Sequence, residues 1–400
     1  MADFHQPGRV TTIHDLRLMT DQDRRLDLSR WSAESPISLI IPTLFSDLDS
    51  QVFEHIIDEL AEVDYVREII VGLDRADHRQ FSQAKQVLDR LPQHHRVLWT
   101  DSPTMAEFEN ELAANNVAPI GYGKGRNVWL CLGYFLASDR GKTVAVHDSD
   151  IVDYSRSMLD RLLYLVAHPG MEVEAAKGFY ARNDQQQLTG RVTRLLMAPL
   201  FEALRGLGDS EPALEYLEFL SDFRYVLSGE HAMTTAVARS VRLPAAWSVE
   251  LEFLASFYNY PGARNICQVE ITDQYDHKHQ DLSPADGGGL VAMAGEIVAA
   301  LARQLAASGL TLDEDSLVDL AGSYRDIANQ MLESYRRDAI ANGLSFDVGS
   351  ERIAVEVFAK AVLTADLSQP PQVGSSWHSV ESRIPHSLER LAKIVEADNA

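Results

Sequence analysis

Short apolar runs alternate with stretches of helical periodicity through the first half of the chain. Between the runs, apolar residues recur at helical spacing near 50–63, 78–91 and 125–138. Strands and helices that alternate in this way form a parallel sheet with right-handed crossovers. The pattern therefore predicts a Rossmann-like α/β domain whose ligands gather at the carboxyl ends of the strands. The predicted strands are Ile37–Ile41, Glu68–Leu73, Arg96–Trp99 and Thr143–His147.

The rest of the chain changes character twice. Strand-like segments at 173–180 and 266–271 flank a helix-like segment at 192–207, and beyond Gly287-Gly288-Gly289 the pattern becomes helical. We therefore predict that residues 1–35 form an N-terminal arm or a short helix around 12–28, followed by an α/β domain over 36–285 and a helical C-terminal extension over 286–400. The helices predicted in this extension cover 290–307, 311–341, 353–363 and 388–395.

The composition is that of a soluble globular protein, with 46% hydrophobic and 24% charged residues among 400. A net charge of −23 argues against nonspecific binding to nucleic acid or to anionic membranes. No apolar run approaches the roughly 20 residues of a membrane span, and the N-terminus lacks a signal-peptide core, so we expect a cytoplasmic protein. Cys131 and Cys267 lie in apolar stretches, where we expect buried packing residues.

Asp148-Ser149-Asp150 directly follows a predicted buried strand. Two carboxylates at the end of a buried strand are costly unless a cation compensates them, and a divalent ion that carries a sugar-nucleotide diphosphate would do so. The same tripeptide also occurs in ordinary turns that follow a strand. The neighbouring motifs therefore have to distinguish a metal site from a turn.

A glycine-rich loop, Gly121-Tyr122-Gly123-Lys124-Gly125, precedes the helix that leads to this strand. Its glycines would let backbone amides approach a diphosphate, and Lys124 would add a positive charge. The loop is not a P-loop, because no Ser or Thr follows the lysine, and its glycine spacing does not match a dinucleotide fingerprint.

Three further clusters carry candidate chemistry. Gly190-Arg191-Val192-Thr193 would offer amides, a guanidinium and a hydroxyl to a carboxylate or phosphate, although a capped surface helix explains it equally well. His277 in Asp276-His277-Lys278-His279 could be a metal ligand, and an exposed loop is the alternative. Glu230 and Glu250 are acids in apolar surroundings, as paired structural or site carboxylates usually are.

Taken in order, these motifs resemble the glucosyl-3-phosphoglycerate synthase family of retaining GT-A glycosyltransferases. The resemblance covers about residues 37–285 and leaves the helical extension unexplained. The segments that carry it are Gly123-Lys124-Gly125, Asp148-Ser149-Asp150, Lys177-x-Phe179-Tyr180-x-Arg182, Gly190-Arg191-Val192-Thr193, Gly229-Glu230-x-Ala232, Val249-Glu250 and Asp276-His277.

The resemblance implies transfer of glucose from a nucleotide sugar, UDP-glucose in the first place, to the 2-hydroxyl of 3-phosphoglycerate, with Mg²⁺ or Mn²⁺ as cofactor. It assigns catalytic roles to Asp150, Lys124 and Glu250, with Glu250 near the transferred hexose. It implies metal ligation by Asp150 and His277, nucleotide-sugar contacts from Pro42, Leu44, Asp74, Lys124, Asp148 and Ser149, and acceptor contacts from Gly190, Arg191, Thr193 and His279.

Two departures from the family pattern keep alternatives open. Phe45-Ser46-Asp47 replaces an acidic stretch after the first strand, which affects recognition of the base, and His279 replaces an asparagine at the acceptor. Mannosyl-3-phosphoglycerate and glucosylglycerate synthases are therefore alternatives within this class of transferase. A sugar nucleotidyltransferase and a scaffold protein assembled through the C-terminal helices are the alternatives outside it. We expect those helices to cover the catalytic domain or to build a homodimer.

Overall fold

The computed structural model describes residues 6, 8–119, 121–184, 186–208, 210–245, 248–260, 265–276 and 290–400. Packing divides the chain into two units. The first comprises 1–180, 228–273 and 372–400, and the second comprises 181–227 and 274–371.

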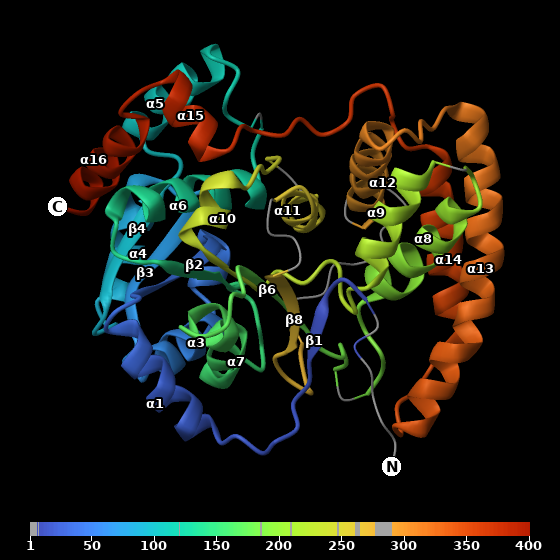
Figure 1. Cartoon of the computed structure of the whole chain (residues 1–400), viewed down its shortest axis with the longest axis horizontal. Helices are drawn as coiled ribbons and strands as arrows, with labels where there is room; N and C mark the ends of the chain where they lie inside the picture. Colours follow the sequence, from blue (N-terminus) through green and yellow to red (C-terminus); the bar gives the residue numbers. More distant parts are fainter. Residues whose placement is uncertain are drawn as a thin grey trace. The chain divides into compact units, whose positions relative to one another are not determined.

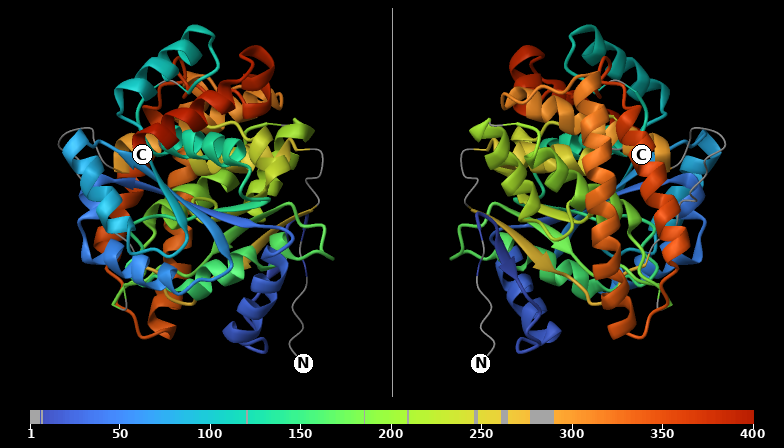
Figure 2. Two further views of the ribbon diagram at one scale, coloured as in Figure 1. Left: turned by 90° about the vertical axis from the view of Figure 1, so that its left-hand side faces the viewer. Right: turned by 90° about the vertical axis from the view of Figure 1, so that its right-hand side faces the viewer.

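The first unit is built on one mixed sheet, whose strand order is β1-β8-β6-β7-β5-β2-β3-β4. All neighbouring strands are parallel except at β7, which runs antiparallel to β5 and β6. The strands fan out with the twist of an open sheet (Figure 2). Their bounds are β1 Thr11–Ile13, β2 Ile37–Leu44, β3 Val66–Asp74, β4 His94–Trp99, β5 Thr143–Val146, β6 Ala175–Phe179, β7 His231–Thr234 and β8 Ile266–Glu270.

Helices cover both faces of this sheet. α6 and α16 lie over one face, and α7 and α1 lie over the other (Figure 1). Buried on both faces, β2 and β5 are nearly continuous apolar runs, as central strands of parallel sheets are. The helices are α1 Asp21–Ser32, α2 Phe45–Leu48, α3 Gln51–Ala61, α4 His78–Leu88, α5 Pro103–Ala114, α6 Lys124–Ser138, α7 Arg156–Ala167, α10 Thr235–Ser240, α11 Val249–Tyr258, α15 Trp377–Arg383 and α16 Ser387–Asn399.

The four predicted strands, which are β2, β3, β4 and β5, and the three predicted helices, which are α3, α4 and α6, are confirmed. The short helix expected around 12–28 is wrong at its beginning, because residues 11–13 form β1 and pair in parallel with β8. The Gln268 amide also donates to the Thr12 hydroxyl at 2.9 Å. The N-terminal arm is thus an edge of the sheet, followed by helix α1.

The last residues of the chain belong to the first unit and not to a separate extension. The indole rings of Trp377 and Trp129 stack with centroids 4.3 Å apart, and each ring N–H donates to a backbone carbonyl, of Trp129 and Ser375 respectively. The Arg96 guanidinium binds the Glu396 carboxylate of α16 at 2.8 Å. Through these contacts residues 372–400 pack in the first unit with the sheet. The predicted boundary at 285 placed them in the C-terminal extension instead.

The second unit is helical in its described part. Pro199 lies in the first turn of α8 and has no N–H with which to complete a helical bond to the carbonyl of Leu195. The Tyr324 hydroxyl of α13 donates to that carbonyl instead, at 2.5 Å, and the turn before Pro199 is a π-helix, η1. Its helices are η1 Val192–Met197, α8 Ala198–Arg205, α9 Glu211–Ser221, α12 Leu290–Ala307, α13 Glu314–Ala341 and α14 Val348–Leu363. Figure 2 shows α13 and α14 side by side.

One helix corrects the expectation that no segment approaches the length of a membrane span. α12 has 18 residues with a mean hydropathy of 1.5, so by length and composition it could cross a membrane. However, 56% of it is buried inside the protein, and it packs on α14. A core helix passes the same test, so α12 is weak evidence for a membrane.

Glu68 is a fully buried carboxylate in β3. Burial raises its pKa to about 7, although the Ser138 hydroxyl donates to it at 2.9 Å and the Arg140 guanidinium lies 3.6 Å away. The folded protein therefore binds more protons than the unfolded chain from about pH 4.5 to 7. Stability should fall as the pH rises through this window.

We predict that Glu68→Gln removes this loss. Between pH 5 and pH 8 the wild type should lose roughly 2–3 kcal/mol more unfolding free energy than the variant does. Urea denaturation at both pH values measures the difference, with the exposed Glu54→Gln as a matched control that should follow the wild type. Equal pH dependence in wild type and E68Q would contradict the prediction.

Candidate active site

Three of the predicted site residues meet at the carboxyl end of β5. The Lys124 ammonium, at the start of α6, lies 2.6 Å from the Asp148 carboxylate and 2.8 Å from the Glu250 carboxylate in the first turn of α11. The three side chains are 12–27% exposed, so solvent reaches this cluster. Residues far apart in the sequence thus form one charged group.

Negative charge is in excess around this lysine. Burial opposes the charge on Lys124, but the carboxylates of Asp148 and Glu250 outweigh it and raise the pKa of the ammonium group. Burial and the neighbouring Asp148 carboxylate raise the pKa of Asp150 to about 6. Asp150 is thus a largely buried carboxylate next to a second carboxylate.

Glycine is required where the loop before β7 passes the acidic pair. A Cβ atom added at Gly229 would lie 2.3 Å from one carboxylate oxygen of Asp148. A second constraint holds at Gly123, the N-cap of α6, whose φ of 145° is a conformation that side chains disfavour. These glycines allow the backbone to enclose the cluster.

The network behind Gly229 was only partly anticipated from the sequence. The buried Lys177 ammonium donates to the Ser228 carbonyl at 2.8 Å and lies 3.0 Å from Nε2 of His231, whose Nδ1 lies 3.0 Å from the Gly229 carbonyl. This arrangement requires a neutral His231 with its proton on Nδ1. Burial lowers the pKa of Lys177 to about 7 and that of His231 well below its ordinary value.

Glu230 completes this wall of the site. Its carboxylate accepts a hydrogen bond from the Tyr180 hydroxyl at 2.8 Å, and its side chain is fully buried. The motif that contains Lys177 indicated this residue in the sequence. It did not indicate the pairing of Lys177 with His231, because that pairing depends on β6 and β7 being neighbours in the sheet.

The residues predicted for the nucleoside pocket lie at the ends of β2 and β3. Pro42 is buried and Leu44 is half-buried, while Asp74 is buried and accepts a hydrogen bond from the Thr100 hydroxyl. Arg126 lies 3.3 Å from Asp74 and binds Glu109 through two N–H groups at 2.6 and 2.7 Å. Sequence reasoning missed Arg126 and Glu109. Burial raises the pKa of Asp74, against the effect of Thr100 and Arg126.

The predicted acceptor residues lie together in the second unit, at the start of η1. Gly190 adopts a left-handed φ of 70°, and Arg191 follows it with a half-buried side chain. Thr193 carries a buried hydroxyl that has no hydrogen-bond partner among the residues that the structure describes. A buried hydroxyl without a partner is costly, and a ligand at this position would supply one.

Two predicted residues, His277 and His279, lie outside the described residues. Within the described part of the chain, no three His, Cys, Asp or Glu side chains are grouped as a metal site. The metal ligation predicted for Asp150 and His277 thus stays a prediction.

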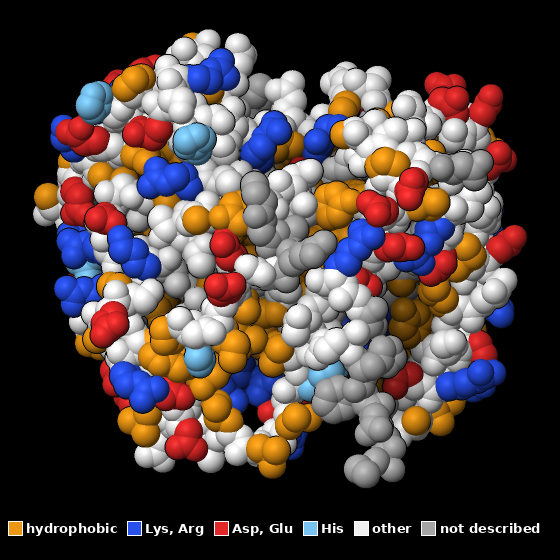
Figure 3. Space-filling view, viewed as in Figure 1, with side chains coloured by type: hydrophobic (Ala, Val, Ile, Leu, Met, Phe, Trp, Pro, Cys, Tyr) orange, Lys and Arg blue, Asp and Glu red, His pale blue; other side chains and the backbone are white. Residues whose placement is uncertain are grey.

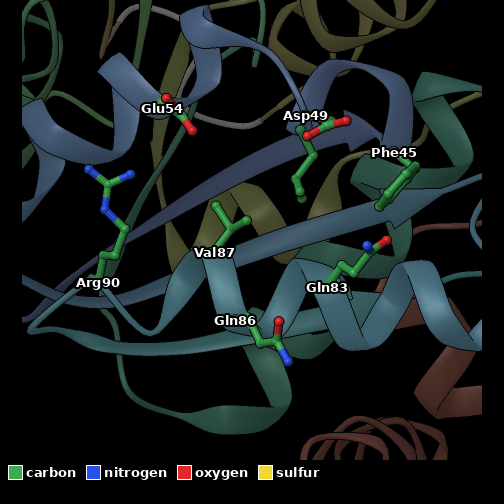
Figure 4. Close-up of a pocket in the computed structure, with 8 residues that line it drawn as sticks. Phe45, Asp49, Glu54, Gln83, Gln86, Val87 and Arg90 are labelled. Atoms are coloured by element: carbon green, nitrogen blue, oxygen red, sulfur yellow. The ribbon is translucent and has the colours of Figure 1, made fainter.

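A separate groove of about 450 Å³ lies between α2, α3 and α4 (Figure 4). The predicted site residues do not line it, although Phe45, from the segment that departs from the family pattern, does. Its lining residues are Phe45, Leu48, Asp49, Glu54, Gln83, Gln86, Val87 and Arg90.

Comparison with known proteins identifies relatives along the whole chain. A glucosyl-3-phosphoglycerate synthase of Persephonella marina is 36% identical over 406 residues, covering 100% of both chains. A second, of Methanococcoides burtonii, is 31% identical over 99% of this chain and 98% of its own. No family model matches the chain.

Solved structures show the same fold. Glucosyl-3-phosphoglycerate synthase of Mycobacterium tuberculosis in complex with phosphoglyceric acid has a TM-score of 0.54 and 22% identity, over 76% of this chain and 89% of its own. The complex of that enzyme with Mn²⁺, UDP-glucose and phosphoglyceric acid gives the same values.

The sheet, with its acidic pair at the end of β5, defines a glycosyltransferase of the GT-A fold, and the predicted fold class is confirmed. The full-length identities then settle the family. The chain belongs to the glucosyl-3-phosphoglycerate synthases, as the motif order predicted.

We predict that Gly229→Ala impairs the site without unfolding the protein. The added Cβ would push the Asp148 carboxylate away from Lys124, so kcat/KM should fall by about 100-fold, the scale of losing one charge-stabilising contact. Steady-state kinetics and a thermal melt measure the two effects. The matched control is Gly322→Ala in α13, where an added Cβ meets nothing within 4 Å. That control should keep full activity, and equal activity in the two variants would contradict the prediction.

Proposed function

We propose that this protein transfers glucose from UDP-glucose to the 2-hydroxyl of 3-phosphoglycerate, with retention at the anomeric carbon and with Mg²⁺ or Mn²⁺ bound. The observation that carries the proposal is the Lys124–Asp148–Glu250 cluster beside Asp150, at the strand end where GT-A folds bind their donors. Family membership supports it, because both full-length relatives bear the name of this activity.

The donor set suits a hard divalent cation. Mg²⁺ and Mn²⁺ prefer carboxylate oxygens, and Asp150 is a carboxylate whose pKa is raised by burial and by the neighbouring Asp148. We assign it as a ligand, with His277 as a second. The mycobacterial enzyme of the same fold is known in complex with Mn²⁺ and UDP-glucose and with Mg²⁺ and UDP. When bound, the ion would neutralise charge on the diphosphate as it departs.

The side chains of the cluster have separate roles in this proposal. Lys124, held between two carboxylates, keeps its charge and stabilises the leaving diphosphate. Glu250 positions the hexose, and Asp148 and Ser149 contact the nucleotide sugar. Pro42, Leu44 and Asp74 line the nucleoside pocket. Retention without an assigned nucleophile favours attack from the same face, with the leaving phosphate oxygen accepting the proton of the acceptor hydroxyl.

The acceptor group of the second unit completes the assignment. Gly190, Arg191 and Thr193 bind phosphoglycerate, with the guanidinium pairing its anionic group and the Thr193 hydroxyl donating to it. His279 is the fourth predicted contact. Mannose as the transferred sugar and unphosphorylated glycerate as the acceptor are the alternatives that the departures at Phe45 and His279 keep open.

The setting of the enzyme is part of the proposal. We infer a cytoplasmic homodimer, and the net charge of −23 disfavours binding to nucleic acid or to anionic membranes. Acidic and basic side chains are interspersed on the face that Figure 3 shows. Sedimentation equilibrium measures the oligomeric state, and a monomeric mass would overturn the dimer.

The direct test incubates the protein with Mn²⁺, UDP-glucose and 3-phosphoglycerate and measures UDP release and product mass. A nucleotidyltransferase would instead release pyrophosphate from an NTP and a sugar phosphate. Parallel reactions with GDP-mannose and with glycerate identify the donor and the acceptor. Absence of UDP release from every pair would overturn the proposal.

We predict that Asp150→Asn lowers kcat by about 100-fold or more at saturating Mn²⁺, because an amide replaces the charge that the ion requires. The matched control is Asp139→Asn, a surface aspartate in a left-handed conformation that asparagine also adopts. That control should keep wild-type turnover. Near-normal turnover of D150N would count against Asp150 as a metal ligand.

A further inference from the structure

One glutamate of the C-terminal helices joins two arginines of the predicted acceptor segment. The carboxylate of Glu351, in the first turn of α14, accepts from Nε of Arg191 at 2.8 Å and from Nη1 of Arg194 at 3.0 Å. The Glu351 side chain is only 5% exposed. Both ion pairs therefore lie where water screens them weakly.

The two arginines are not equivalent. Arg194 also donates to the carbonyls of Thr189 and Leu188, at 2.8 and 3.2 Å, and lies over the Tyr335 ring at 5.0 Å. Its side chain is 12% exposed. These contacts make Arg194 a structural member of the group.

Arg191 is held from one side and is open on the other. Besides Glu351, it donates from Nη2 to the Ser350 hydroxyl at 3.0 Å, and 30% of its side chain is exposed. A guanidinium has five N–H donors, and within the described part of the chain Arg191 uses two of them, toward Glu351 and Ser350. The remaining donors can meet an anion while Glu351 and Ser350 keep the plane of the group fixed.

The loop before α14 binds the same segment at a second point. The backbone N–H and hydroxyl of Ser345 both donate to the Gln186 carbonyl, at 2.7 and 2.9 Å. With Tyr324 on the Leu195 carbonyl, α13, α14 and the loop between them thus hold residues 186–195 at three places. A helix that only covered residues 186–195 would not need to bind them at three separate places.

The charge balance of the group leaves room for a ligand. Arg191 and Arg194 carry two positive charges and Glu351 one negative charge, so the group retains one positive charge. A carboxylate or phosphate of the acceptor would complete the neutralisation. The glutamate therefore orients the arginine without cancelling the attraction.

We propose that Glu351, with Ser350, is a positioning residue that fixes Arg191 for the acceptor, which makes α14 a part of the acceptor site. The inference rests on the proposed function, in which Arg191 binds phosphoglycerate. The family motifs leave the C-terminal helices unexplained. In this proposal these helices orient the arginine that binds the acceptor anion.

The test measures KM for acceptor and donor separately in Glu351→Gln. Loss of the carboxylate should raise KM for 3-phosphoglycerate about 10-fold and leave KM for UDP-glucose within about twofold, because only acceptor binding uses Arg191. If the wild type uses glycerate, the same comparison is made with glycerate. Glu356→Gln is the matched control, because Glu356 lies on the same helix and pairs with Arg325 at the surface, 58% exposed. That control should match the wild type in both KM values.

A second variant keeps the test decisive if E351Q does not fold. Ser350→Ala leaves both ion pairs intact and removes only the contact to Nη2, so KM for the acceptor should rise about threefold. An unchanged acceptor KM in E351Q overturns the inference, as does an equal rise for donor and acceptor. If E351Q is unfolded, an unchanged acceptor KM in S350A overturns it. An inactive wild type would instead mean that the proposed function has failed.

Discussion

The ion pairs of Lys124 with Asp148 and Glu250 are the interaction on which the rest of the site depends. One ammonium joins the start of α6, the end of β5 and the first turn of α11, with distances of 2.6 and 2.8 Å. Without it, two carboxylates and Asp150 would crowd one strand end with no compensating charge. The lysine therefore fixes the geometry before any ligand arrives, and it limits the negative charge that a cation must still balance.

Much of the fold could be predicted, because the signals were local. The β2, β3, β4 and β5 strands appear as apolar runs, and the helices between them have a clear period. β7 was missed because it runs antiparallel between β5 and β6, an order that depends on distant pairing. The return of residues 372–400 to the first unit was missed for the same reason. Its anchor, Trp377 on Trp129, joins segments about 250 residues apart.

The features of the site divide in the same way, into those with a local motif and those that depend on contacts between distant segments. Lys124, Asp148 and Glu250 were each predicted as site residues and lie together in the structure, whereas the roles assigned to them stay proposals. Arg126 and Glu109 were not predicted, because neither belongs to a motif and their contact joins α6 to α5, while Asp74, which Arg126 also binds, lies on β3. Lys177 stood in a motif, but only the neighbouring strand shows that His231 must be neutral to accept its hydrogen bond.

In the second unit a single proline affects the helix that carries the proposed acceptor residues. Pro199 leaves the Leu195 carbonyl without a helical donor, and the Tyr324 hydroxyl of α13 replaces it. The preceding turn widens into a π-helix, a rare form that is frequent at functional sites. That turn contains Thr193 and Arg194, and Arg191 is its N-cap. Because α13 supplies the replacing hydroxyl and α14 supplies Glu351, the conformation of the predicted acceptor residues depends on helices more than 120 residues away in the sequence.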